Sequence, residues 1–190
     1  MGGFVPPTRY AAGTKPAARQ AGGYYVTIVT WQRESLFGKI VNGEMELNHY
    51  GKVVQKWWYE IENHFPNVET GAFVVMPNHI HGIIFILDGR GTVPVPNANN
   101  LHNAKGGETP PLQTSTFQGI PTLGQIIAYF KYQSTKEMNL LDNTGTVTKF
   151  WQRNYYEHIL RNEKDLQNKT EYIEANPLLW EQDEENPIHK

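Results

Sequence analysis

Two apolar runs rich in β-branched residues stand out in the pattern of the chain. They occupy residues 68 to 76 and 79 to 87, on either side of a Pro-Asn turn, and predict the two antiparallel strands of a hairpin. Two histidines, His79 and His81, open the second strand. Because successive side chains of a strand alternate between faces, these histidines point the same way, about 7 Å apart along the strand. The pattern therefore predicts two imidazoles that are directed at one point.

The remaining segments divide into helices and strands by the spacing of their apolar residues. Apolar residues three and four apart predict amphipathic helices, whereas aromatic and β-branched runs predict strands. Asparagines that suit helix N-caps precede two of the helices, and Pro177 ends the last one. The expected elements, in chain order, are a strand at 24 to 31, a loop or short hairpin at 32 to 46, a helix at 48 to 64, the hairpin strands, a helix at 121 to 141, a strand at 149 to 160 and a helix at 162 to 176.

This order of elements is that of an α+β, ferredoxin-like fold (βαββαβ) with an extra C-terminal helix. Such a fold has its first two helices on one face of an antiparallel sheet, where Ile80, Ile84 and Ile86 can be buried. His79 and His81 then belong to the opposite face. The third helix is the element left to cover that face.

The length of 190 residues suits one sizeable core. We expect a single domain at 24 to 180, with a loop insertion at 88 to 120 that is rich in Gly, Pro and Asn. Residues 1 to 23 contain basic side chains and no acidic ones, and predict a flexible basic arm. Residues 181 to 190 are expected to form an acidic tail.

Composition narrows the possible chemistry. Seventeen basic and nineteen acidic residues give a formal net charge of -2, so any nucleic-acid surface must be local. The absence of cysteine excludes disulfides, thiolate zinc sites and cysteine nucleophiles, and leaves His, Asn, Gln, Asp and Glu as metal ligands. No apolar run has the length of a membrane span, and the amino terminus lacks the basic-then-apolar order of a signal peptide, so we expect a cytoplasmic protein without a membrane partner.

The third predicted helix offers groups that complement the histidines. Tyr172 and Asn176 lie one turn apart and are therefore neighbours on its surface. If this surface lies against His79 and His81, two imidazole nitrogens and an amide oxygen form three metal ligands beside a phenol. This ligand set suits manganese or magnesium, and zinc is also open.

Other interpretations of the polar and aromatic residues stay open. Tyr155 and Tyr156 are rival nucleophiles, although they lie on opposite faces of a predicted strand. His158 suits a structural hydrogen bond. Lys131 and Lys136, on the second helix, either line a track for phosphates or form a solvated face.

Two motifs carry a resemblance to a known family. They are VVMPNHIHGIIFI and, later, FWQRNYYEHILRNEKDLQNKTEYIEANPLLW. In this order they resemble the REP-associated tyrosine transposases, a branch of the single-tyrosine (insertion-sequence-200-like) transposases in the His-hydrophobic-His (HUH) endonuclease superfamily. The resemblance covers about residues 22 to 187. It implies a metal-dependent transposase or nickase that cleaves and rejoins single-stranded DNA beside a hairpin, through a covalent 5′-phosphotyrosine intermediate, as a monomer or homodimer.

The resemblance also implies roles for individual residues. Tyr172 matches the nucleophile of the family, and His79 and His81 match its metal-binding pair. Asn176 matches the position that completes the ligation of a divalent ion, Mg or Mn, although related transposases have glutamine there. The candidate contacts to DNA are Arg153, Lys131, Lys136 and Lys169.

Two other functions are compatible with the same fold. One is a non-catalytic module that binds single-stranded nucleic acid, in which Trp151, Tyr155 or Tyr156 would stack on bases. The other is a metal-dependent hydrolase of small phosphoesters, which would form no covalent adduct with the protein.

Overall fold

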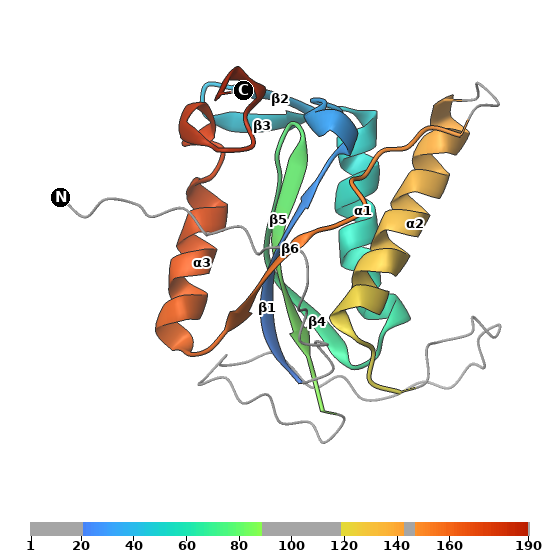
Figure 1. Ribbon diagram of the computed structural model, residues 1–190, viewed down its shortest axis with the longest axis vertical. Helices are drawn as coiled ribbons and strands as arrows, with labels where there is room; N and C mark the ends of the chain where they lie inside the picture. The colour runs from blue at the N-terminus through green and yellow to red at the C-terminus, as the bar shows by residue number, and fades with distance from the viewer. Residues whose placement is uncertain (1–20, 89–118, 143–146, 190) are drawn as a thin grey trace, which may run out of the picture.

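A four-stranded antiparallel sheet lies at the centre of the described part of this computed structural model, which comprises residues 21–88, 119–142 and 147–189 (Figure 1). Its strands are β1 (Gly22–Val29), β4 (Val68–Val75), β5 (His79–Ile86) and β6 (Tyr156–Leu160), in the spatial order β4-β5-β1-β6. The helices are α1 (His49–His64), α2 (Leu123–Asp142) and α3 (Glu163–Ala175). The predicted α+β order of elements is therefore confirmed. Most of the predicted arm and insertion lies outside the described residues.

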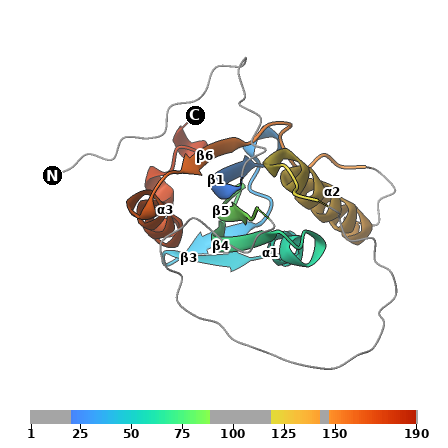
Figure 2. The same cartoon turned by 90° about the horizontal axis from the view of Figure 1, so that it is seen from below.

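The helices form layers on the two faces of the sheet. Helices α1 and α2 pack on one face and α3 lies on the other, as Figure 2 shows. The larger core, between the sheet and α1 and α2, contains Ile80, Ile84 and Ile86, as predicted. A smaller cluster on the α3 side is built around Tyr25 and Ile173. None of the described helices is both long enough and apolar enough to cross a membrane.

Local signals in the sequence account for several boundaries. The predicted short hairpin is formed by β2 (Gly38–Val41) and β3 (Glu44–Leu47). Its turn residues Asn42 and Gly43 have φ values of 53° and 80°, the left-handed region that a two-residue hairpin turn requires. Asn48 and Asn162 cap α1 and α3, each accepting a hydrogen bond from a backbone N–H of the first turn.

The last strand of the sheet is shorter than the prediction of 149 to 160. Strand β6 begins at Tyr156, and Trp151 forms only an isolated bridge with Thr30. Between them the Nζ of Lys131 donates to the backbone carbonyls of Gln152 and Asn154, at 2.9 and 3.1 Å. Because these carbonyls are satisfied by α2, the segment leaves the ladder. The aromatic residues that suggested a strand here serve to pack the core.

Residues beyond α3 continue over the end of the sheet at which the β4–β5 turn lies (Figure 1). They form two short 3-10 turns, η2 (Trp180–Gln182) and η3 (Pro187–His189). Asp183 and Asn186, between these turns, are buried. The last segment therefore packs against the domain and brings a carboxylate into it.

Gly82 provides a test of the packing between the sheet and α1. A Cβ at this position would overlap the fully buried ring of Trp58. We expect Gly82→Ala to lower the free energy of unfolding by about 1–3 kcal/mol, because overpacking forces a rigid ring to move. Denaturant unfolding followed by circular dichroism measures the change.

The matched control is Gly124→Ala at the start of α2, where no atom lies closer than 3.9 Å to the added Cβ. This variant is expected to keep or raise the stability, by up to about 1 kcal/mol, because alanine favours helix. An equal loss of stability in both variants would contradict the packing described.

Candidate metal centre

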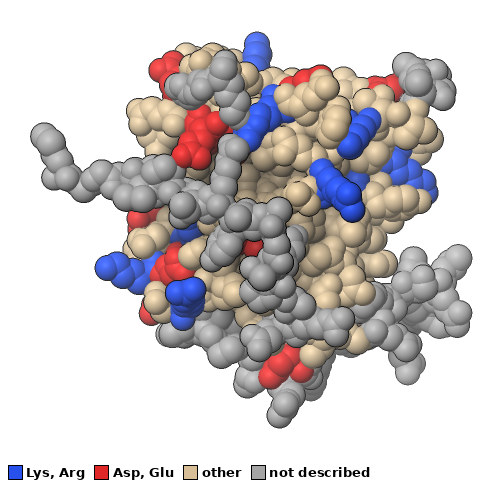
Figure 3. All heavy atoms as spheres, viewed as in Figure 1, with Lys and Arg blue, Asp and Glu red and all other residues tan. Residues whose placement is uncertain are grey.

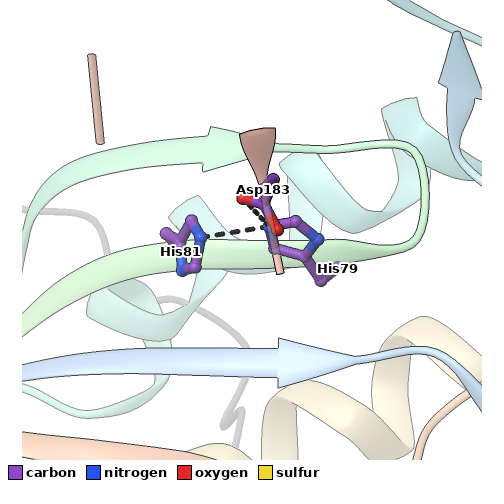
Figure 4. A group of neighbouring side chains, drawn as sticks. All are labelled: His79, His81 and Asp183. Atoms are coloured by element: carbon purple, nitrogen blue, oxygen red, sulfur yellow. Dashed lines mark hydrogen bonds and ion pairs between the residues drawn. The ribbon is translucent and has the colours of Figure 1, made fainter. Parts of the chain in front are cut away.

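His79 and His81 lie side by side at the start of β5, on the face turned towards α3. Their Nε2 atoms are 3.0 Å apart, and the two residues are 0% and 3% exposed. The predicted common direction of the side chains is therefore confirmed (Figure 4). Two buried imidazoles present the same ring nitrogen to one point.

The outer ring nitrogens of both histidines are engaged in hydrogen bonds. The Nδ1 of His79 lies 2.9 Å from Oδ1 of Asn78. The Nδ1 of His81 lies 2.7 Å from the hydroxyl of Tyr25 and 2.9 Å from that of Thr27. Such outer contacts orient imidazoles that bind metals. They leave both Nε2 atoms directed at the common point.

Burial keeps both imidazoles uncharged at neutral pH. It lowers the pKa of His79 well below its ordinary value, and the neighbouring His81 and Arg33 lower it further. Burial, with the charge of Lys169, lowers the pKa of His81 to about 3. A metal ion requires the neutral imidazole, so the environment favours the form that can act as a ligand.

Asp183 adds a carboxylate that the sequence did not point to. Its Oδ2 lies 3.8 Å from Nε2 of His79, and one donor atom from each of His79, His81 and Asp183 lies within 4.8 Å of the others (Figure 4). Asp183 falls in the segment expected to be an acidic tail. The available signal was Trp180, because a large aromatic residue is unusual in a solvated tail. Its ring centroid lies 6.0 Å from that of His79.

Helix α3 brings Tyr172 against the histidines. The ring centroid of Tyr172 lies 5.2 Å from that of His81 and 6.2 Å from that of Tyr25. Burial and the negative charge of Asp183 raise the pKa of Tyr172 to about 12, against the opposing effect of a hydrogen bond with Asn176. The phenol is therefore protonated at neutral pH.

Asn176, the C-cap of α3, supplies a further donor atom. It is 1% exposed, and among the described residues its Oδ1 has no hydrogen-bond partner. A buried carbonyl oxygen without a partner is costly, and a cation would satisfy it.

The Asn176 oxygen, the two imidazoles and the Asp183 carboxylate form a donor set that suits Mg, Mn or Zn. The separation of 3.0 Å between the Nε2 atoms is also that of two ligands at right angles, each about 2.1 Å from an ion. The residues present therefore fit a divalent metal.

The other predicted candidates lie at different distances from this centre. Lys169 is close to it, since its Nζ lies 4.7 Å from the ring centroid of Tyr25 and 5.9 Å from that of Tyr172. Lys131 and Lys136 lie on α2, on the opposite face of the sheet, and Arg153 is exposed in the segment before β6. Lys131 is engaged with backbone carbonyls.

The rival aromatic residues divide between the two faces. Tyr155 packs against the larger core, whereas Tyr156 packs on the α3 side, edge-on to Tyr25 at 6.3 Å between centroids. His158 makes the expected structural contact, with its Nε2 2.9 Å from Oδ2 of Asp165.

Comparisons with known proteins give one sequence relative and a fold. No protein-family model matches the chain. The chain is 38% identical over 169 residues to an uncharacterized protein of Haemophilus influenzae, and the aligned region covers 87% of this chain and 86% of that protein.

The structure of a REP-associated tyrosine transposase bound to a REP hairpin is similar at a TM-score of 0.50 and 18% identity, over 92% of this chain and 73% of that chain. A putative transposase from Deinococcus radiodurans gives a TM-score of 0.42 and 16% identity, over 88% of this chain and 96% of the other. The first of these structures supports a transposase-like fold.

The donor set predicts that Mn²⁺ stabilises the folded protein. An ion that binds only the folded state raises the free energy of unfolding by about 2.7 kcal/mol when the free Mn²⁺ concentration is 100 times the Kd. Thermal unfolding with and without Mn²⁺ measures the shift, and isothermal titration measures the affinity.

The double variant His79→Ala, His81→Ala is expected to abolish the shift. The control His49→Ala removes an exposed histidine and should leave it intact. Absence of a shift in the wild-type protein at saturating Mn²⁺ would refute the metal centre.

Proposed function

We propose that this chain, which belongs to the same family as the uncharacterized Haemophilus influenzae protein, is a metal-dependent enzyme that cleaves and rejoins single-stranded DNA beside a hairpin. The observation that carries the proposal is the contact of Tyr172 with the buried pair His79 and His81, at 5.2 Å between the rings of Tyr172 and His81. A phenol beside a metal centre suits the formation of a covalent phosphotyrosine. The similar fold of a transposase bound to a REP hairpin supports the choice of substrate.

In this proposal the fold is ferredoxin-like, and the additional helix α3 carries the nucleophile. The phenol oxygen of Tyr172 forms a bond to phosphorus, and the bond from phosphorus to the 3′-oxygen breaks. The phenol loses its proton and the departing 3′-oxygen gains one, which leaves a 5′-phosphotyrosine and a 3′-hydroxyl. One phosphodiester replaces another, so the linkage can be used to rejoin a strand.

The Tyr172 phenol needs help to react. With a pKa of about 12, roughly one phenol in a hundred thousand is ionised at neutral pH. His79, His81 and Asn176 would hold a Mg or Mn ion, with Asp183 completing the donor set. When bound, such an ion polarises a phosphodiester oxygen and stabilises the departing one. Lys169, beside Tyr172, would contribute positive charge next to the phosphate.

A second surface has the character of a track for DNA. Lys131, Lys149 and Arg153 line a shallow depression, and the buried aromatic residues Phe150 and Trp151 also contribute to its lining. In Figure 3, Lys and Arg side chains gather on the right of the face shown, the side on which α2 lies. The exposed side chains of Lys149 and Arg153 suit the phosphates of a single strand.

The nucleophile is tested by trapping. Incubation with a single-stranded hairpin oligonucleotide and Mn²⁺ is expected to leave a protein-DNA adduct that survives denaturing electrophoresis. Tyr172→Phe should form no adduct, because it lacks the attacking oxygen, whereas the matched variant Tyr156→Phe should form it normally. If Tyr172→Phe reacts as well as the wild type, the nucleophile is another residue.

The proposed track is tested by the salt dependence of DNA binding. Each phosphate contact that is lost should reduce the slope of log K against log salt by about 0.7 for a single strand. Arg153→Ala and Lys149→Ala, at two exposed residues that line the depression, are expected to show this change in fluorescence anisotropy. Lys39→Ala, an exposed lysine on β2, is the control and should bind as the wild type does.

The same assays separate the alternative functions. Binding that is unchanged by a chelator, without an adduct, would favour a non-catalytic nucleic-acid-binding module. Turnover of small phosphoesters without an adduct would favour a hydrolase.

A further inference from the structure

Asn78, in the turn between β4 and β5, is a buried polar residue with three hydrogen-bond partners. Its side chain is fully enclosed. Its Nδ2 donates to the backbone carbonyl of Glu185 at 2.6 Å and to that of Arg33 at 3.1 Å. Its Oδ1 lies 2.9 Å from Nδ1 of His79. One amide therefore links the turn, the first histidine and the C-terminal segment.

The chemistry of these partners fixes the orientation of the Asn78 amide. Backbone carbonyls only accept hydrogen bonds, so the side-chain atom that faces two of them must be the NH₂ group. The oxygen of the amide then faces Nδ1 of His79. Because this oxygen also only accepts, Nδ1 must carry a hydrogen. A neutral imidazole carries one such hydrogen, so the Nε2 of His79 has a free lone pair.

We infer that Asn78 is a positioning residue that sets His79 in the tautomer a metal ion needs, before any ion arrives, and fastens the segment that carries Asp183. The inference rests on the proposed metal-binding role of His79. The tautomer itself is a property of the metal-free protein.

His81 has the opposite tautomer in the metal-free protein. The lone pair on Nε2 of His79 faces Nε2 of His81 at 3.0 Å, so the His81 atom carries the hydrogen and donates it. Its Nδ1 then accepts from the hydroxyl of Tyr25 at 2.7 Å. The Thr27 hydroxyl lies 2.9 Å from the same nitrogen and donates to the Tyr25 oxygen at 3.3 Å. The two histidines are therefore inequivalent, and Asn78 is the origin of the difference.

For His81 to become a ligand through Nε2, its proton must be relocated. One proton leaves Nε2 and one is gained at Nδ1, so the imidazole stays neutral. The hydroxyls of Tyr25 and Thr27 can turn to accept the new N–H, because a hydroxyl both donates and accepts. His79 needs no such change.

The first test measures tautomers in the wild-type protein. Long-range ¹H–¹⁵N correlation spectra of metal-free protein labelled in histidine, at neutral pH, distinguish Nδ1–H from Nε2–H. We expect Nδ1–H for His79 and Nε2–H for His81, with signals assigned by the variants His79→Gln and His81→Gln. An Nε2–H tautomer at His79 would overturn the inference, and this result does not depend on the folding of any Asn78 variant.

The second test separates the two roles of the amide. Asn78→Ala removes the acceptor, so we expect mixed tautomers at His79 and a loss of about 10- to 100-fold in Mn²⁺ affinity by titration. Asn78→Asp keeps an acceptor but has no donor for the carbonyls of Arg33 and Glu185. It should retain the Nδ1–H tautomer while amide hydrogen exchange of residues 183 to 188 becomes faster.

The matched control is Asn48→Ala, which removes another asparagine that donates to a backbone carbonyl, that of Leu36 at 2.8 Å. It should lower stability and leave the tautomer of His79 and the Mn²⁺ affinity as in the wild type. Wild-type tautomers and affinity in Asn78→Ala would overturn the inference.

Failure of this inference and failure of the proposed function give different results. The expected tautomers and an Asn78-dependent Mn²⁺ affinity, without a DNA adduct, would support the inference and overturn the transposase. A Tyr172 adduct in a protein whose His79 carries Nε2–H would support the transposase and overturn the inference.

Discussion

The packing of α3 and the C-terminal segment over the start of β5 is the contact on which the candidate site depends. Without this cover His79 and His81 would lie on an open sheet face, and Tyr172, Asn176 and Asp183 would be elsewhere. Two imidazoles can be buried here because each outer nitrogen has a hydrogen-bond partner from the sheet or its turn. The cover and these partners together hold polar groups in a place from which water is excluded.

Burial has opposite consequences for the two kinds of group in this site. It lowers the pKa of the histidines, which keeps them neutral and able to bind a metal. It raises the pKa of Tyr172, which keeps the phenol protonated and weakly nucleophilic. The same environment therefore favours the neutral form that the proposed ligands need and disfavours ionisation of the proposed nucleophile. A divalent ion held by these residues would supply positive charge that offsets the cost of forming negative charge at the reacting oxygens of the proposed reaction.

The sequence predicted the parts of this arrangement that follow from short periodicities. Alternation along a strand gave the common direction of His79 and His81, and helical spacing gave the pairing of Tyr172 with Asn176. The length of β6 could not be predicted, because a lysine on α2 satisfies the carbonyls that would have extended it. Asn78 was predicted only as a turn residue. Its contact with Glu185 joins positions 107 residues apart, and no local pattern encodes it.

Helix α3 is held at both of its ends, and this bears on how the site is assembled. At its start, burial opposes ionisation of Asp165, but hydrogen bonds from His158 and from the backbone N–H of Arg161 outweigh it and lower the carboxyl pKa. At its end, Asn176 is enclosed beside the histidines. Tyr172 lies between these fixed points, against His81 of the same chain. One chain therefore supplies both imidazoles, the phenol, the amide and the carboxylate.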